Sequence, residues 1–235
     1  MGIFNRENNK RWNYSNKRAQ KNYLIPKLWR VFLAYHSSQD FFNNVVNMLD
    51  DGICTTYPNR FPSTSSLREM NAGARGIDAH GDKDVLLEAL ISGNTPVTKA
   101  SSVRTTHVDA ADKLFAGLFY MRPDDYTASG GDLTVSRFKP EYSGDAKLGC
   151  FKRQYVDESF VETVDTIGYA RNRLVLFVNS LDSLHGVTVR QPTRQVRRFV
   201  NLVGEVRPPL FELPRIARLA ATQPPQLVHP VTNLR

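Results

Sequence analysis

A histidine and an aspartate stand two residues apart in this sequence, shortly before an apolar segment. They are His107 and Asp109, and the segment at residues 114–121 is rich in aromatic residues and ends at a proline. Residues i and i+2 of an extended backbone point to the same side, so an imidazole nitrogen and a carboxylate oxygen can converge on one metal ion. The pair is a candidate metal site, and the apolar segment predicts the buried strand beside it.

The same spacing occurs a second time, at His80 and Asp82. That pair lies in a glycine-rich stretch that leads into residues 84–91, which have helical character. A loop that feeds a helix is a poorer platform for two convergent ligands than the end of a strand. We therefore favour His107 and Asp109, and we interpret His80 as a solvated loop histidine.

A third ligand is expected from another strand, late in the chain. Residues 174–178 form a short apolar run that is typical of a fully buried strand, and His185 follows after a turn-like segment. With His107 and Asp109 it would complete a set of two histidines and one carboxylate, which is typical of non-haem Fe(II) oxygenases. Without that pair, His185 would be interpreted as a histidine that closes a hairpin.

Several arginines follow His185, and a guanidinium at the start of a strand suits bidentate binding of a carboxylate. Arg198 is our first candidate for this anchor, because it begins a predicted strand at residues 198–203. Arg197 and Arg190 are the alternatives. Arg194 is interpreted as a solvated residue.

The order of these residues resembles the 2-oxoglutarate and Fe(II)-dependent dioxygenase superfamily, and in particular its prolyl-4-hydroxylase-like branch. The likeness covers about residues 101–205, and it includes the Gly-Gly-Asp-Leu segment at residues 130–133. The stretch from His185 to Arg198 is slightly longer than is usual in that family. For this reason Arg197 and Arg190 stay open as anchors.

The resemblance implies a double-stranded β-helix of the jelly-roll type, with Fe(II) held by His107, Asp109 and His185. It implies 2-oxoglutarate and O₂ as cosubstrates and ascorbate as a candidate stimulant. The expected reaction is hydroxylation of a small-molecule or peptide substrate, an anionic one being a candidate, with release of succinate and CO₂. The residues expected to contact the cosubstrate are Arg198, Arg190, Arg197, Tyr120 and Arg104. The alternative for Tyr120, which we favour, is a core residue whose hydroxyl is hydrogen-bonded.

Length and composition fit one domain with a mainly β fold and flanking helices. The chain has 235 residues, of which 41% are hydrophobic, enough to form a substantial core. Residues 23–95 are expected to carry the helices, residues 96–206 the β-helix core and residues 207–235 a C-terminal extension. Within the first part, residues 57–81 are loop-like and are expected to cover the mouth of the site.

Residues 1–22 are interpreted as a basic, flexible leader. The net charge of +8 comes largely from the two ends of the chain, and nucleic-acid binding is the corresponding alternative. We do not expect a nucleic-acid partner, because a basic surface also suits an anionic substrate or cosubstrate. A non-catalytic jelly-roll protein that binds a metal or a polyanion is the second alternative.

The sequence predicts a cytoplasmic protein. No apolar run approaches the ~20 residues of a membrane span, and the N-terminus lacks the apolar core of a signal peptide. Cys54 and Cys150 do not form a disulfide framework, and a reducing compartment suits both thiols and ferrous iron.

Overall fold

The structure is a computed structural model, and it describes residues 8–213. Antiparallel β-sheet dominates these residues, with a few helices, which confirms the prediction of a mainly β fold with flanking helices. The strands are β1 (Arg11–Ser15), β2 (Ala72–Ala74), β3 (Val85–Asn94), β4 (Lys113–Met121), β5 (Leu133–Phe138), β6 (Phe151–Lys152), β7 (Tyr155–Val156), β8 (Val161–Ile167), β9 (Arg171–Val178), β10 (His185–Val187) and β11 (Arg197–Val206). The helices are α1 (Asn16–Gln20), α2 (Lys27–Tyr35), α3 (Gln39–Thr56) and α4 (Thr64–Arg68), with the 3₁₀ turns η1 (Pro140–Tyr142), η2 (Gly144–Cys150) and η3 (Glu158–Phe160).

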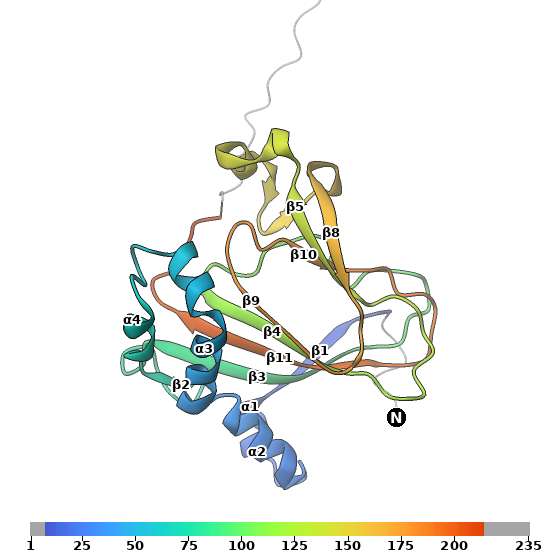
Figure 1. Ribbon diagram of the computed structural model, residues 1–235. Coiled ribbons are helices and arrows are strands. Elements are labelled where there is room, and N and C mark those ends of the chain that lie inside the picture. Colours follow the sequence, from blue (N-terminus) through green and yellow to red (C-terminus); the bar gives the residue numbers. More distant parts are fainter. Residues whose placement is uncertain (1–7, 214–235) are drawn as a thin grey trace, which may run out of the picture.

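Two sheets form the centre of the molecule (Figure 1). The larger has the strand order β1-β3-β11-β4-β9, and β2 pairs in parallel with β3. The smaller has the order β10-β5-β8. Residues 97–107 extend the smaller sheet beyond β10, because isolated bridges pair them with residues 185–193. A short hairpin of β6 and β7 contacts this segment at His107 and Tyr155.

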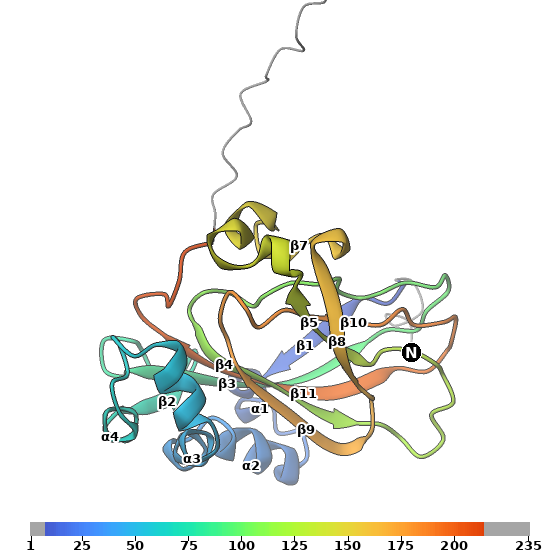
Figure 2. The same ribbon diagram turned by 45° about the horizontal axis from the view of Figure 1, so that its top comes forward.

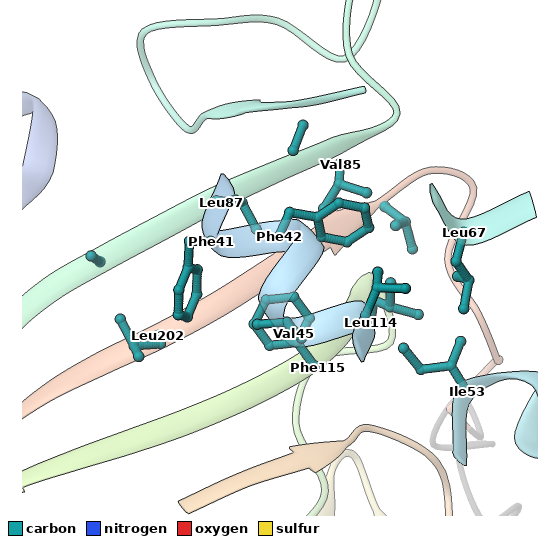
Figure 3. Close-up of a cluster of buried hydrophobic side chains, with 14 of the residues drawn as sticks. Phe41, Phe42, Val45, Ile53, Leu67, Val85, Leu87, Leu114, Phe115 and Leu202 are labelled. Carbon is teal, nitrogen blue, oxygen red and sulfur yellow. The ribbon is translucent and has the colours of Figure 1, made fainter. Parts of the chain in front are cut away.

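The helices cover the face of the larger sheet that points away from the smaller one, as the turned view in Figure 2 shows. Helix α3 begins after Ser38, whose hydroxyl accepts a hydrogen bond from the amide of Phe41 at 3.4 Å, a normal N-cap. Its buried side packs on the sheet to form the main core (Figure 3). Residues of that core are Phe41, Phe42, Val45, Ile53, Leu67, Val85, Leu87, Leu114, Phe115 and Leu202.

Successive side chains of β11 point alternately into this core and into the space between the sheets. Val200 and Leu202 pack into the core under the helices. Arg197, Phe199 and Asn201 therefore face the opposite side, since successive strand residues point to opposite faces. The start of β11 thus delivers a buried cation, an aromatic ring and an amide to the interior between the sheets.

The expectation of helical character at residues 84–91 is wrong, because this stretch forms most of β3. Leucine, alanine and glutamate favour helices only weakly, by tenths of a kcal/mol per residue. Here the strand lies between β1 and β11 and is buried on both faces over much of its length. Pairing and burial on both sides outweigh the local preference.

The expectation of a flexible leader over residues 1–22 is wrong for its described part. Strand β1 pairs with β3 along its whole length, from Arg11 opposite Asn94 to Ser15 opposite Leu90. Tyr14 packs against the main core, which ties this edge strand to the sheet. Residues 1–7 of the leader and residues 214–235 of the C-terminal extension lie outside the described residues.

Two further observations bear on the predicted organisation. Residues 57–81 contain α4 and β2, and none of them lines the cavity between the sheets, so they do not cover the site as expected. Among the helices of residues 8–213, none is both long enough and apolar enough to cross a membrane.

Candidate metal centre

His107 and His185 are directly opposite each other on adjacent antiparallel segments. The amide of each donates to the carbonyl of the other at 2.9 Å. Residues paired in this way project their side chains to the same side, and the two imidazole ring centroids are 4.2 Å apart. Their apolar neighbours Val108 and Leu184 point the other way, into a second buried cluster. Alternating polarity in both segments therefore aims both histidines at the interior between the sheets.

Asp109 joins the pair because it lies two residues after His107. One ligand atom from each of the three residues lies within 4.8 Å of the others, and all three side chains are buried. The group could hold a metal ion, and no other group of this kind occurs among residues 8–213. His80 lies in a partly exposed turn region, in line with its interpretation as a loop histidine.

Hydrogen bonds to the backbone fix which nitrogen of each imidazole is available. Nδ1 of His107 lies 2.7 Å from the carbonyl oxygen of Thr105, and Nδ1 of His185 lies 2.9 Å from that of Ser183. A carbonyl can only accept, so each Nδ1 carries the proton and each Nε2 presents a lone pair. Nε2 of His107 is buried and has no hydrogen-bond partner. A buried acceptor without a partner is costly, and a metal ion would satisfy it.

The electrostatics favour the protonation states that a metal requires. Burial lowers the pKa of His107, and His185 and Arg104 lower it further. Burial likewise lowers the pKa of His185. Burial alone would raise the pKa of Asp109, but Lys113, His185 and Arg104 overcome this and lower it. At neutral pH both imidazoles are therefore neutral and the carboxylate is ionised, which are the forms that bind metals.

Aromatic rings hold the histidines in place. The ring of His185 lies between those of His107 and Phe177, with centroids 4.2 and 4.7 Å away. Tyr155 packs against His107 at 5.8 Å from the hairpin of β6 and β7. Both imidazoles are thus fixed by a backbone hydrogen bond and by a ring contact.

The three candidate ligands line a cavity of about 230 Å³ between the two sheets. Its walls combine apolar side chains with several cations and a single carboxylate, that of Asp109. The lining residues are Arg11, Asn94, Val103, Arg104, His107, Asp109, Lys113, Ala116, Gly117, Leu118, Leu133, Phe177, His185, Val187, Arg197, Phe199 and Asn201.

Arg197 is the buried cation of this cavity, with 2% of its surface exposed. Its Nη1 donates to Oδ1 of Asn94 at 3.3 Å, whereas its Nε and Nη2 and the Nδ2 of Asn94 have no partner. Its Cζ lies 4.8 Å from the ring centroid of Tyr120 and 5.0 Å from that of Phe199. Burial lowers the pKa of Arg197, although the nearby tyrosines raise it. Unpaired donors at a buried cation are suited to a carboxylate ligand.

Gly131 makes room for this arginine, and Gly130 makes room for the backbone of Val189. Gly130 and Gly131 have φ angles of +76° and +90°. A Cβ atom at Gly131 would lie 3.1 Å from Cδ of Arg197, and one at Gly130 would clash with the carbonyl of Val189. The Gly-Gly segment noticed in the sequence therefore borders the side chain of Arg197, and this backbone conformation favours glycine.

The prediction that Arg198 faces the site is wrong by one residue. Arg198 is exposed on the opposite face of β11, and its backbone amide donates to the hydroxyl of Tyr169 at 2.9 Å. The sequence showed where this strand lies but not which of two adjacent arginines points inward. Arg197, one of the two alternatives, occupies the inward position.

Arg190, the other alternative, has a structural environment. It is fully buried away from the cavity. Its guanidinium donates to Oδ1 of Asn9 at 2.7 Å and to the carbonyl oxygens of Thr95 and Gln195 at 3.0 and 2.9 Å. These bonds connect the segment before β11 to the N-terminal segment. Both terminal nitrogens of this guanidinium are therefore partnered within the protein, and its Nε alone has no partner.

The remaining predicted residues divide between the cavity and its surroundings. Arg104 lines the cavity, with Nη1 at 3.4 Å from Oδ1 of Asp109. Tyr120 is fully buried under Arg197 and does not line the cavity. Its hydroxyl has no partner, and burial raises its pKa. Tyr120 is therefore a core residue that contacts the buried arginine, as its alternative interpretation stated.

The sequence did not point to Arg11 or Lys113 as residues of the site. Nζ of Lys113 lies 3.2 Å from Oδ1 of Asp109. Its position four residues after Asp109 was visible, but nothing marked it as inward-facing. Arg11 was assigned to the leader, where the alternation of Arg11-Trp12-Asn13-Tyr14 was the available signal for a strand.

Comparison of the chain with protein-family models gives no match, and comparison with curated proteins gives none either.

Proposed function

We propose that this protein is a dioxygenase that uses Fe(II) and 2-oxoglutarate. The observation that carries the proposal is the coexistence, in one cavity, of a buried group of two histidines and a carboxylate with a buried arginine whose donors lack partners. The first is the ligand set of non-haem Fe(II) oxygenases. The second provides a site for a carboxylate that such a cosubstrate brings.

The donor set fits the proposed metal. Neutral imidazoles and a carboxylate suit Fe(II), and three protein ligands leave coordination positions for other ligands. His107, Asp109 and His185 would hold the ion, and Arg197 with the free Nδ2 of Asn94 would bind the distal carboxylate of 2-oxoglutarate. When bound, Fe(II) and 2-oxoglutarate would supply oxidative decarboxylation by O₂, in which one oxygen atom ends in succinate, formed together with CO₂, and the other ends in the hydroxyl group of the substrate.

The chain's own contribution is binding, orientation and exclusion of water. Apolar side chains of Leu118, Leu133 and Phe177 form part of the cavity wall and would limit the access of water when substrate is bound. The carbonyls of Thr105 and Ser183 hold the imidazoles in the tautomer that presents Nε2. The positive end at Arg197 would orient 2-oxoglutarate, and its charge does not titrate near neutral pH.

The strand order supports the finer description of the fold as a double-stranded β-helix of the jelly-roll type. Along the chain, β3 belongs to the larger sheet, residues 97–107 to the smaller and β4 to the larger again. After β5 and β8 in the smaller sheet, β9, β10 and β11 alternate in the same way. Two facing sheets with connections that alternate between them are typical of jelly rolls.

A non-catalytic metal-binding protein is the alternative, and the cavity gives less support to it. A metal ion with only a structural role does not require a separate buried cation in the same cavity. Arg197 would then be a buried cation without function, held at a cost of several kcal/mol.

Titration of 2-oxoglutarate by calorimetry, into protein with and without Mn(II) as a redox-inert substitute for Fe(II), tests the proposal. We expect binding that requires the metal and that is lost in His107→Ala and in His185→Ala. His80→Ala is the matched control, because it removes a histidine outside the cavity. Metal-independent binding, or no binding by the wild-type protein, would refute the proposal.

A further inference from the structure

The cavity carries more positive charge than the metal site and the cosubstrate explain. Arg11, Arg104, Lys113 and Arg197 line it together with one carboxylate, that of Asp109. Lys113 and Arg104 approach Asp109 at 3.2 and 3.4 Å. Arg197 is used by 2-oxoglutarate in the proposed function. Arg11 has no role in that scheme. Arg104 stacks over the ring of Tyr155, and its one acidic contact is with a carboxylate that Lys113 also approaches.

Arg11 reaches the cavity from the edge of the larger sheet. It is paired with Asn94 of β3, and Asn94 is paired in turn with Arg197 of β11. Residues in one row across a sheet project to the same face, so these three side chains face the same interior. The Cζ atom of Arg11 lies 5.1 Å from the ring centroid of Phe199, which holds the guanidinium against the cavity wall.

No carboxylate of the described residues forms an ion pair with Arg11. Its Nε donates to the amide oxygen of Asn13 at 3.2 Å. Burial lowers the pKa of Arg11 to about 10; Arg104 and Arg197 also lower it, while Asp109 raises it. An anion bound beside the partly buried guanidinium of Arg11 would offset the repulsion that it experiences from the neighbouring cations.

The two arginines come from edge segments of the two sheets and line the same cavity. Strand β1 is the edge strand of the larger sheet, and residues 97–107 form the edge of the smaller one. Strand β3, next to β1, leads directly into residues 97–107. Arg11 and Arg104 therefore line the cavity from the same side of the sandwich, one from each sheet.

We infer that Arg11 and Arg104 form an oxyanion subsite for the substrate, which is a small acidic molecule carrying a carboxylate or a phosphate group. The inference rests on the proposed function, which assigns Arg197 to the cosubstrate. A guanidinium binds either oxyanion through two parallel hydrogen bonds, and a pair of them fixes its orientation. The remainder of the substrate then extends from this edge toward His107 and His185.

Nuclear magnetic relaxation tests the subsite without requiring turnover. The protein is loaded with Mn(II) and saturating 2-oxoglutarate, and inorganic phosphate or acetate is added as the probe. Paramagnetic Mn(II) accelerates relaxation of phosphorus or carbon nuclei that bind near it. We expect enhanced relaxation for at least one probe, and the response of the two distinguishes a phosphate site from a carboxylate site. Arg11→Gln and Arg104→Gln should each lower the affinity for the probe that binds by about tenfold or more.

Two further variants control for charge and folding. Arg18→Gln removes the same charge from an exposed position of α1 and should leave the probe affinity unchanged. Arg11→Lys keeps the charge in the edge strand and should retain more affinity than Arg11→Gln. Equal thermal midpoints of the two Arg11 variants would show that the loss is not a folding defect.

The outcomes separate this inference from the proposed function. If wild-type protein fails to bind 2-oxoglutarate, the proposed function fails, and the same probes on the Mn(II)-loaded protein still decide the subsite. The inference is overturned if neither probe relaxes faster, or if Arg11→Gln binds the probe as the wild type does. It is also overturned if Arg11→Gln loses 2-oxoglutarate together with the probe, because Arg11 would then belong to the cosubstrate site.

Discussion

Replacing Arg197 with methionine should weaken 2-oxoglutarate binding without weakening the fold. The side chain is 2% exposed and makes one hydrogen bond, to Asn94 at 3.3 Å, while its Nε and Nη2 have no partner. Methionine has a similar length, no charge and enough flexibility to fill the space beside Tyr120 and Phe199. The substitution therefore removes the charge while largely preserving packing.

The loss of affinity follows from leaving the cosubstrate carboxylate unpaired. Removing one partner of a buried charged pair costs about 3–5 kcal/mol. At about 1.4 kcal/mol per tenfold change, the dissociation constant of 2-oxoglutarate should rise about 150-fold to 5,000-fold.

The effect on stability should have the opposite sign or be close to zero. In the protein without ligand, the guanidinium of Arg197 is desolvated at a cost of several kcal/mol. Stacking on the rings of Tyr120, Phe199 and Tyr169 recovers only part of this, at roughly 0.5–2 kcal/mol per contact. We therefore expect the free energy of unfolding of Arg197→Met to equal that of the wild type or exceed it by up to about 2 kcal/mol.

Calorimetric titration of 2-oxoglutarate into Mn(II)-loaded protein, together with urea unfolding of metal-free protein, measures both effects. Arg198→Met is the matched control, because it removes the same charge from the adjacent, exposed position. It should leave both quantities unchanged. Wild-type affinity in Arg197→Met, or the loss of affinity in Arg198→Met instead, would refute the assignment.

Three further predictions concern the surroundings of the site. Arg190→Met should lower the free energy of unfolding, measured by urea titration, by about 3–5 kcal/mol. The reason is that Asn9 and the carbonyls of Thr95 and Gln195 lose the hydrogen bonds that Arg190 donates. A loss below about 1 kcal/mol would contradict the structural role of Arg190. Gly131→Ala should cost about 1–3 kcal/mol through its φ of +90° and also weaken 2-oxoglutarate binding by displacing Arg197, which calorimetry and unfolding together would show. Burial lowers the pKa of His36, although its hydrogen bond to the carbonyl of Phe32 raises it. As pH falls, the unfolded chain is therefore protonated before the folded one. Stability that is present above pH 6.5 is lost below it, by at most about 1.4 kcal/mol per pH unit. His36→Phe should reduce the difference in unfolding free energy between pH 7 and pH 5.5, to which His107 and His185 also contribute. An unchanged difference would exclude a contribution from His36.

The sequence was sufficient to locate the candidate metal ligands because their placement follows from local rules. His107 and Asp109 share a side through the alternation of an extended backbone. His185 was placed late in the chain beside an apolar run, and its pairing with His107 depends on contacts between distant segments that only the structure displays.

Other features could not be predicted because they depend on tertiary pairing. Strand β3 has the composition of a helix, and burial between neighbouring strands decides its conformation. Arg197 and Arg198 are identical in type and adjacent, so a shift of one residue in register decides which is buried. Arg11 joins the cavity only because β1 pairs with β3 at the far edge of the sheet.

Release of succinate from 2-oxoglutarate in air, by protein loaded with Fe(II), tests the central claim most directly. The cavity predicts slow release even without substrate, faster release when the true substrate is present, and none in His185→Ala or Arg197→Met. His80→Ala should behave as the wild type does. If Fe(II) binds to His107, Asp109 and His185 but the wild-type protein forms no succinate, with or without a panel of small acidic molecules, the site is a metal-binding site without this chemistry.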